Sequence, residues 1–174
     1  MPASPPRWRV TSGTPDPATV ERLLRQLPAW FGIESSVREY IEAARQMPAY
    51  LAWPADPADP ADAPAAKAAG APGSQPEGVL LAARHFPGAA EISLMAVAPG
   101  AHRRGAGRAL VAALEADLTA DGVRFLQVKT LGPAHPDAGY AKTRRFYAAV
   151  GFEPLEEIHG LWPENPCLIM IKVL

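Results

Sequence analysis

The sequence predicts a single α/β domain built around a mixed sheet. The length of 174 residues suits one domain, and the hydrophobic fraction of 48% is enough to fill a core. Helical and strand-like stretches alternate in the order two helices, a strand, a hairpin, a helix, a strand, a helix and two strands. We expect this domain to span residues 8–174, after a disordered N-terminus at residues 1–7.

The N-terminal part predicts two helices followed by a short strand. Asp16 as N-cap and Pro17 at the first helical position begin the first helix, which leucines at helical spacing continue to Pro28. Ser36 and Glu39 form the pattern of a capping box, which predicts the start of the second helix. The stretch MPAYLAW that follows is typical of a strand.

Residues 54–76 form a low-complexity segment with three tandem Pro-Ala-Asp units. Almost nothing in it is apolar and larger than alanine, so it cannot bury enough surface to become ordered. We expect a flexible loop that joins two strands, and not a domain boundary. A surface insertion without chemistry is the simplest interpretation, and a segment that contacts a partner protein is the alternative.

The C-terminal part predicts a hairpin, two helices and three further strands. GVLLAARHF and AEISLMAV are strands on either side of a Pro-Gly turn. A helix follows over residues 107–122, with Leu110, Leu114 and Leu118 on one face and Gly122 at its C′ position. VRFLQVKTL then predicts a strand, YAKTRRFYAAVG a helix that ends at Gly151, and FEPLEEI and CLIMIKVL the last two strands.

Charge and composition exclude several classes of protein. The formal net charge is −1, and no stretch approaches membrane-spanning length or a secretion signal. We therefore expect a cytoplasmic protein with no nucleic-acid or membrane partner. The one cysteine, Cys167, lies in an apolar run and excludes an internal disulfide, and the four histidines lack the spacing of metal ligands, so we expect no metal.

The stretch APGAHRRGAGRAL, residues 98–110, places a glycine-rich loop between a strand and a helix. Free amide N–H groups and the positive end of the helix dipole make such a helix start an anion site. Arg103, Arg104 and Arg108 add positive charge around it. A β–α turn whose glycines only allow tight packing is the alternative at this point. The P-loop lysine and the third glycine of a dinucleotide fingerprint are both missing.

A second motif connects this loop with a known family. TRRFYAAVGFEPL resembles the helix-to-strand signature of the GNAT-type N-acetyltransferases, and HRRGAG resembles their acetyl-CoA loop, Gln/Arg-x-x-Gly-x-Gly/Ala. One helix and one strand separate the two motifs, as in the family. The resemblance covers about residues 76–174. It implies a mainly antiparallel central sheet flanked by about four helices, in an enzyme that moves an acetyl group from acetyl-CoA directly to a primary amine.

The resemblance also implies roles for individual residues. Backbone groups of Met95, Ala96 and Val97 would bind the pantetheine arm of acetyl-CoA. Tyr147 would be the general acid, and Glu91 the base that deprotonates the amine, often through water. The pyrophosphate would be held by the amides of Arg103, Arg104, Gly105, Ala106, Gly107, Arg108 and Ala109.

The sequence departs from the family at two cofactor-binding positions. His102 stands where the family usually has Gln or Arg, and Tyr140 where many members have an Asn that contacts the cofactor arm. Trp30 and Phe31 are candidates for the wall of the acceptor site, as is the loop at 131–140.

Each of these roles has a simpler alternative. Tyr147 can be a core tyrosine beside Phe146, Glu91 a solvated glutamate at a strand end, and the pair Trp30–Phe31 a hydrophobic corner between two helices. The run of carboxylates at 153–157 competes for the role of base. The sequence does not identify the acceptor, which we expect to be a small-molecule or peptide amine, and a homodimer is a candidate assembly. A non-catalytic CoA-binding sensor is the competing function.

Overall fold

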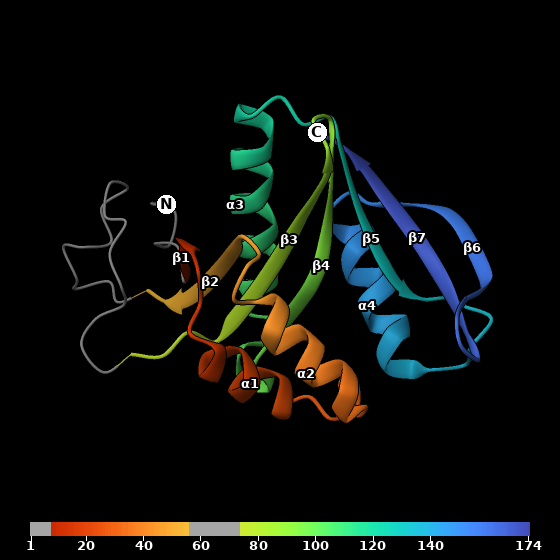
Figure 1. Ribbon diagram of the computed structural model, residues 1–174, viewed down its shortest axis with the longest axis horizontal. Helices are drawn as coiled ribbons and strands as arrows, with labels where there is room; N and C mark the ends of the chain where they lie inside the picture. The colour runs from red at the N-terminus through yellow and green to blue at the C-terminus, as the bar shows by residue number, and fades with distance from the viewer. Residues whose placement is uncertain (1–7, 56–73) are drawn as a thin grey trace, which may run out of the picture. The chain divides into compact units, whose positions relative to one another are not determined.

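The computed structural model describes residues 8–55 and 74–174 (Figure 1). The disorder predicted for residues 1–7 and most of the loop predicted at 54–76 therefore lie outside the described residues. The helices within the described part are α1 (Pro17–Arg25), α2 (Glu34–Ala43), α3 (Ala106–Ala120) and α4 (Ala138–Ala149), and a short 3₁₀ turn covers Pro99–Ala101. The strands are β1 (Trp8–Gly13), β2 (Ala49–Pro54), β3 (Gly78–Phe86), β4 (Ala89–Val97), β5 (Phe125–Leu131), β6 (Glu153–Trp162) and β7 (Asn165–Val173).

The seven described strands form a sheet in the order β1-β2-β3-β4-β5-β7-β6. The pair β4–β5 is parallel, from Ala89 opposite Phe125 to Ile92 opposite Val128. The pairs β1–β2, β2–β3, β5–β7 and β6–β7 are antiparallel. These observations confirm the predicted mixed, mainly antiparallel sheet with four helices.

The chain divides into two compact units. The N-terminal unit contains the described residues up to Leu81 together with Leu94–Leu114, and the C-terminal unit contains Ala82–Ser93 and Glu115–Leu174. β3, β4 and α3 each contribute residues to both units.

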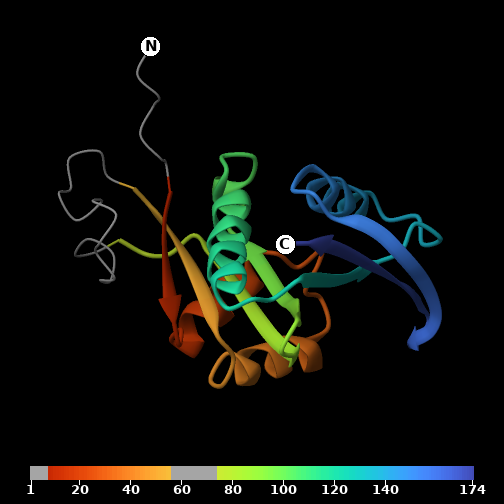
Figure 2. The ribbon, with the colours of Figure 1, turned by 90° about the horizontal axis from the view of Figure 1, so that it is seen from above.

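In the N-terminal unit, α1 begins as its capping residues predict. The Asp16 side chain accepts a hydrogen bond from the backbone N–H of Ala18 at 3.1 Å, and Pro17 opens the first turn. The buried side of the helix presents Val20, Leu23 and Leu24 to a core that α2, β2 and parts of β3 and β4 complete. Figure 2 shows α1 and α2 on one face of these strands and the start of α3 on the other.

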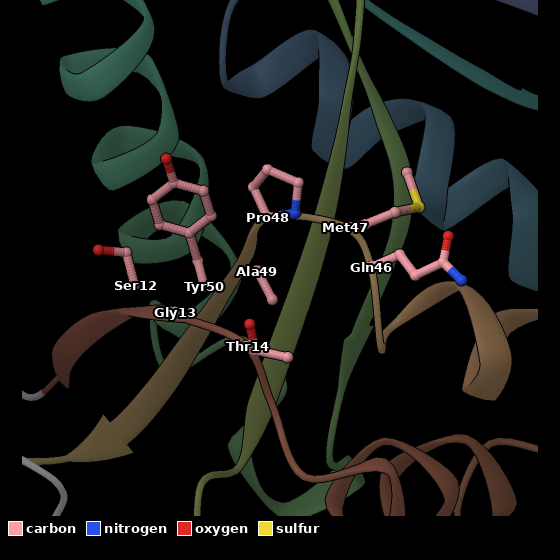
Figure 3. A pocket seen from close by; sticks show the side chains of 8 residues that line it. All are labelled: Ser12, Gly13, Thr14, Gln46, Met47, Pro48, Ala49 and Tyr50. Atoms are coloured by element: carbon pink, nitrogen blue, oxygen red, sulfur yellow. The ribbon is translucent and has the colours of Figure 1, made fainter.

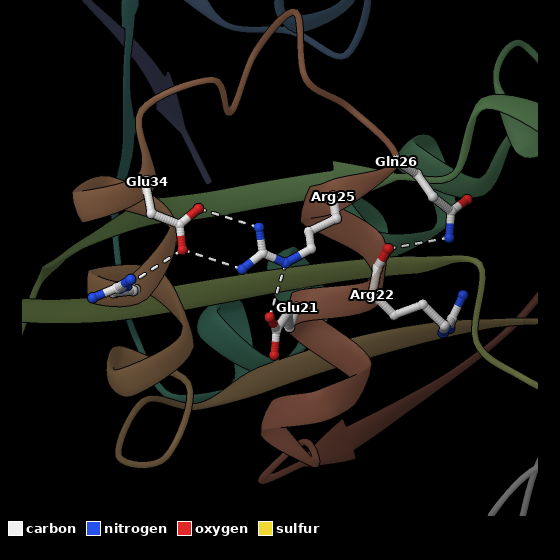
Figure 4. Close-up of polar contacts among 6 residues, drawn as sticks. Glu21, Arg22, Arg25, Gln26 and Glu34 are labelled. Carbon is white, nitrogen blue, oxygen red and sulfur yellow. Dashed lines mark hydrogen bonds and ion pairs between the residues drawn. The ribbon is translucent and has the colours of Figure 1, made fainter.

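The capping box predicted at Ser36 is wrong, because α2 begins at Glu34 with Ile33 as its N-cap. The backbone N–H of Val37 already donates to the carbonyl of Ile33. Two interactions of Glu34 stabilise this start. Its carboxylate lies at the positive end of the helix dipole, and both of its oxygens accept hydrogen bonds from Arg25 of α1 at 3.2 Å (Figure 4).

Strand β1 was not among the predicted elements. It pairs with β2 from Trp8 opposite Pro54 to Gly13 opposite Ala49, which makes it the outermost strand on this side of the sheet order. Only six residues long, it carries a weak alternation in which Trp8 is buried and Val10 half-buried.

In the C-terminal unit, β5 and β7 pair along seven residues and α4 packs against β5. α4 begins at Ala138, two residues before the predicted start, because the Asp137 side chain caps it by accepting from the N–H of Tyr140 at 2.8 Å. Gly151, with φ of +98°, ends it as predicted. β6 is longer than predicted, and its register against β7 shifts between Pro154 and Glu156 and again between Ile158 and Trp162.

Candidate functional site

The glycine-rich loop has a backbone suited to an anion. Arg103 and Gly105 both lie at positive φ, at +60° and +97°, immediately before α3 begins at Ala106. Positive φ at alternate residues is typical of a concave nest for negative charge. Two of the predicted pyrophosphate donors are already used within the chain, because the N–H of Arg104 donates to the carbonyl of Ala101 at 3.3 Å and that of Ala109 to the carbonyl of Gly105 at 3.0 Å. A Cβ added at Gly105 would meet only ordinary contacts, the nearest 3.8 Å away, so this glycine serves the backbone conformation and not tight packing.

Trp8 of β1 contacts this loop through Arg104. Its indole Nε1–H donates to the carbonyl of Arg104 at 2.8 Å, and the Arg104 guanidinium lies 5.9 Å from the centre of the Trp8 ring. The Trp8 side chain is 9% exposed. Sequence reasoning missed this residue because the strand that carries it was not predicted. A large aromatic residue directly after the Pro-rich start could have indicated that an ordered element begins there.

His102 connects the loop to the end of β4. Its Nε2 lies 2.7 Å from the carbonyl oxygen of Val97, and because a carbonyl only accepts, Nε2 carries the proton. Its ring also meets Trp30 edge to face, with centroids 6.2 Å apart. His102 thus takes up one of the backbone groups that Met95, Ala96 and Val97 were predicted to offer to the cofactor. This contact matches a capping role more closely than a role in holding pyrophosphate.

Trp30 and Phe31 pack against the hydrophobic core of the N-terminal unit. Phe31 also meets Tyr40 of α2 edge to face, with centroids 5.9 Å apart. This packing is the predicted alternative, a hydrophobic corner between two helices. The contact of Trp30 with His102 nevertheless joins that corner to the loop.

Two open hollows lie on the N-terminal unit. One, of about 520 Å³, adjoins the loop and is lined by Arg22, Gln26, Pro54, Ser74, Gln75, Glu77, Ala98, Gly100 and Arg104. The other, of about 310 Å³, lies where β1 ends and β2 begins (Figure 3). Its lining consists of Ser12, Gly13, Thr14, Gln46, Met47, Pro48, Ala49 and Tyr50. Arg104 is the one predicted site residue that lines either hollow.

In the C-terminal unit, Glu91 lies at the centre of a polar cluster. Its Oε2 accepts from Lys129 Nζ at 2.7 Å and from Gln127 Nε2 at 2.7 Å, and it lies 2.8 Å from His85 Nε2. The partners come from β3 and β5, and the register places Gln127 directly opposite Glu91. Glu91 is only 8% exposed, so the alternative of a solvated strand-end glutamate is wrong.

The cluster keeps Glu91 ionised. Burial raises the pKa of the Glu91 carboxyl, but the hydrogen bonds from Lys129, His85 and Gln127 and the charge of Lys129 lower it more, so that the pKa falls below its usual range. All three bonds involve Oε2, and among the described side chains we find no donor to Oε1. Oε1 can therefore accept a hydrogen bond from water or from a bound amine.

Tyr147 is the buried residue of α4. It is 5% exposed and meets the rings of Phe146 and Phe152, with centroids 5.4 Å apart in each pair. This packing fits the alternative of a core tyrosine, and the role of general acid stays a prediction. Tyr140 lies in the first turn of the same helix and is half-buried.

The predicted residues thus fall into two groups. The N-terminal unit holds the loop, the end of β4, Trp30 and Phe31, and the C-terminal unit holds Glu91, Tyr140 and Tyr147.

Within the described residues, no group of three or more His, Cys, Asp or Glu is arranged for a metal ion. Cys167 is fully buried, which fits the apolar run that contains it, and burial raises the pKa of its thiol. In the same part of the chain, no helix is long and apolar enough to cross a membrane.

A comparison with models of known protein families finds a match. Residues 72–154 match the model of the acetyltransferase (GNAT) domain family. This part of the chain is therefore similar to a GNAT acetyltransferase domain. This match confirms the resemblance seen in the sequence and the expected class of enzyme, an acetyltransferase. A search of curated proteins finds no match.

Solved structures share the fold of this chain at low sequence identity. A protein from Desulfovibrio desulfuricans that is described as a GNAT-family acetyltransferase is 19% identical, with a TM-score of 0.74 over 95% of this chain and 98% of that one. The ribosomal-protein-S18-alanine N-acetyltransferase of Escherichia coli is 16% identical, with a TM-score of 0.67 over 95% and 93%. A GNAT acetyltransferase from Elizabethkingia anophelis with acetyl-CoA bound is 14% identical, with a TM-score of 0.63 over 97% and 99%.

Proposed function

We propose that this protein is an N-acetyltransferase that moves the acetyl group of acetyl-CoA directly to a primary amine of a small-molecule acceptor. The observation that carries the proposal is Glu91, a buried carboxylate that is held ionised and has one oxygen left for a ligand. Alkylamines are cations at neutral pH, and less than about one in a thousand is neutral and nucleophilic at pH 7. An amine acceptor therefore benefits from a carboxylate oxygen that can accept a hydrogen bond from its N–H groups.

The loop before α3 fits the donor. Positive φ at Arg103 and Gly105 forms the nest for a pyrophosphate, and Arg103, Arg104 and Arg108 supply charge around it. The loop would hold the nucleotide end of acetyl-CoA, and the backbone of β4 up to Val97 the arm. Bound acetyl-CoA supplies the activated thioester.

Glu91 is better suited to orient the acceptor than to take its proton outright. About six pKa units separate an alkylammonium from an ordinary carboxyl, and the pKa of Glu91 is lower still. Glu91 Oε1 would accept a hydrogen bond from the ammonium group or from a water that carries its proton away. The sequence-based role of a base that acts through water fits this environment.

Tyr147 is the proposed general acid for the leaving thiol. A phenol with a pKa near 10 can protonate a thiolate, and positioned proton donors typically contribute 10²- to 10⁴-fold in rate. Direct transfer needs no covalent enzyme intermediate. Cys167 supports this route, because a fully buried thiol with a raised pKa is a poor nucleophile.

Thermal melts with CoA and acetyl-CoA, followed by thiol release with a panel of small amines and short peptides, test the proposal. We expect both ligands to raise the Tm and at least one small amine to release CoA. The absence of any shift in Tm would reject donor binding. Turnover with peptides alone would move the acceptor to the peptide class.

A further inference from the structure

Thr130 of β5 carries a buried hydroxyl that nothing in the described chain satisfies. The residue is 3% exposed, and its Oγ1 has no hydrogen-bond partner among the described residues. A buried polar group left without a partner costs free energy that a valine of nearly the same shape would avoid. A ligand that bonds this hydroxyl would explain its presence.

Strand alternation shows which face of β5 carries this hydroxyl. Gln127 and Lys129 reach Glu91, so they share one face of the sheet with it. Thr130 points to the opposite face, together with Leu126 and Val128, which are both buried. The Glu91 cluster and the Thr130 hydroxyl therefore lie on opposite faces of the strand.

Helix α4 covers the face of Thr130, because Lys172 of β7, which lies opposite Leu126, donates from Nζ to the carbonyl of Val150 at the end of this helix at 2.8 Å. It packs against β5 and lies over β5 and β7 in Figure 2, and Tyr147 is its buried residue. Arg144 of α4 donates to the carbonyl of Leu131 at 2.7 Å, which fixes the helix at the end of β5. Tyr147 follows Arg144 by three residues, about 4.5 Å along the helix, and Thr130 precedes Leu131 by about 3.3 Å along the strand. Thr130 and Tyr147 are each buried on the side where α4 and β5 pack.

We propose that the Thr130 hydroxyl hydrogen-bonds the acetylated arm of bound acetyl-CoA. This inference rests on the proposed function, which places the leaving thiol at Tyr147. The arm carries two amides and a thioester, and a threonine hydroxyl can donate to their carbonyls or accept from their N–H groups. The bond would satisfy Oγ1 only in the complex, so the free protein bears the cost of the unpaired group.

Three variants test this assignment through stability and binding instead of activity. Thr130→Val removes the hydroxyl and keeps the shape, Thr130→Ser keeps the hydroxyl, and Thr119→Val makes the same change at an exposed threonine of α3. We expect the free Thr130→Val protein to melt no lower than wild type, while calorimetry shows a Kd for acetyl-CoA weakened about three- to tenfold. Thr130→Ser should weaken binding less than Thr130→Val, and Thr119→Val should bind as wild type does.

Parallel titrations with CoA identify the group that is bound. Equal weakening for CoA and acetyl-CoA supports a bond to an amide of the arm, and weakening for acetyl-CoA alone supports a bond to the acetyl carbonyl. An unchanged Kd for both ligands, with wild-type binding intact, overturns the assignment of Thr130 alone. Wild-type protein that binds neither ligand overturns the proposed function as well. If Thr130→Val does not fold, Thr130→Ala takes its place with the same binding criterion.

Discussion

Replacing Trp8 by phenylalanine isolates the support that β1 gives to the anion loop. Phenylalanine keeps an aromatic ring beneath Arg104 but removes the indole N–H that holds the Arg104 carbonyl at 2.8 Å. A neutral hydrogen bond of this kind contributes about 0.5–1.5 kcal/mol, which corresponds to a change of about two- to tenfold in an equilibrium constant. Because Arg104 is exposed, water can replace part of the bond, so we expect the lower half of that range.

The loss should fall on the nucleotide end of the donor. We expect Trp8→Phe to raise the Kd for CoA in calorimetry and the KM for acetyl-CoA, with kcat little changed. Acetylpantetheine lacks the pyrophosphate, so its kcat/KM should be the same in variant and wild type. Trp53→Phe is the matched control, because it removes the Nε1–H bond to Thr11 Oγ1, at 2.9 Å, from the same pair of strands without touching the loop.

Two results would refute this reasoning. Equal losses with acetyl-CoA and acetylpantetheine would show that Trp8 acts on the whole unit and not on the loop. Equal losses in Trp8→Phe and Trp53→Phe would show that any indole bond in these strands has the same effect.

Three further predictions concern the proposed catalytic groups and the loop. Tyr147→Phe should lower kcat by about 10²- to 10⁴-fold while calorimetry shows an unchanged Kd for acetyl-CoA; unchanged turnover would remove Tyr147 as the acid. Glu91, whose pKa is lowered in the folded protein, stabilises the fold above pH 4.5 and loses this contribution as the pH falls. Lys129→Met removes one hydrogen bond and one positive charge that lower the pKa of Glu91, so Tm profiles from pH 3 to 7 should show a smaller loss on acidification than in wild type. Gly105→Ala places a side chain at a φ of +97° and should weaken CoA binding by about 1–2 kcal/mol; wild-type affinity would count against the nest.

Local signals in the sequence predicted most of the secondary structure. The cap at Asp16, the turn at Gly151 and the leucine stripe of α3 depend on neighbours a few residues away, and each is found where it was predicted. The start of α2 was misplaced because an ion pair between helices, Glu34 with Arg25, favours a start without a side-chain cap. The sequence spacing of Ser36 and Glu39 carries no information about that pair.

The candidate site was predicted less completely than the fold, since its chemistry depends on register. The motif identified Glu91, but only the pairing of β4 with β5 brings Gln127 and Lys129 to its carboxylate. The orphaned hydroxyl of Thr130 follows from the packing of α4, and no pattern in the strand sequence distinguishes it from an ordinary threonine. Trp8 was missed because strand β1 was not predicted, and its contact with Arg104 joins residues 96 positions apart in the chain.

The irregular register of β6 bears on how the molecule behaves at high concentration. β6 is the last strand of the sheet order, and Leu155 and Leu161 on it are 61% and 47% exposed. A flat outer strand with exposed leucines would be a template on which other chains aggregate. Both register shifts of β6 fall around these leucines, and Pro154 withholds a backbone donor beside the first. The interrupted hydrogen-bond pattern of β6 therefore disfavours pairing with a strand of another chain. A deletion within residues 155–161 that restored a regular strand would favour fibril-like self-association.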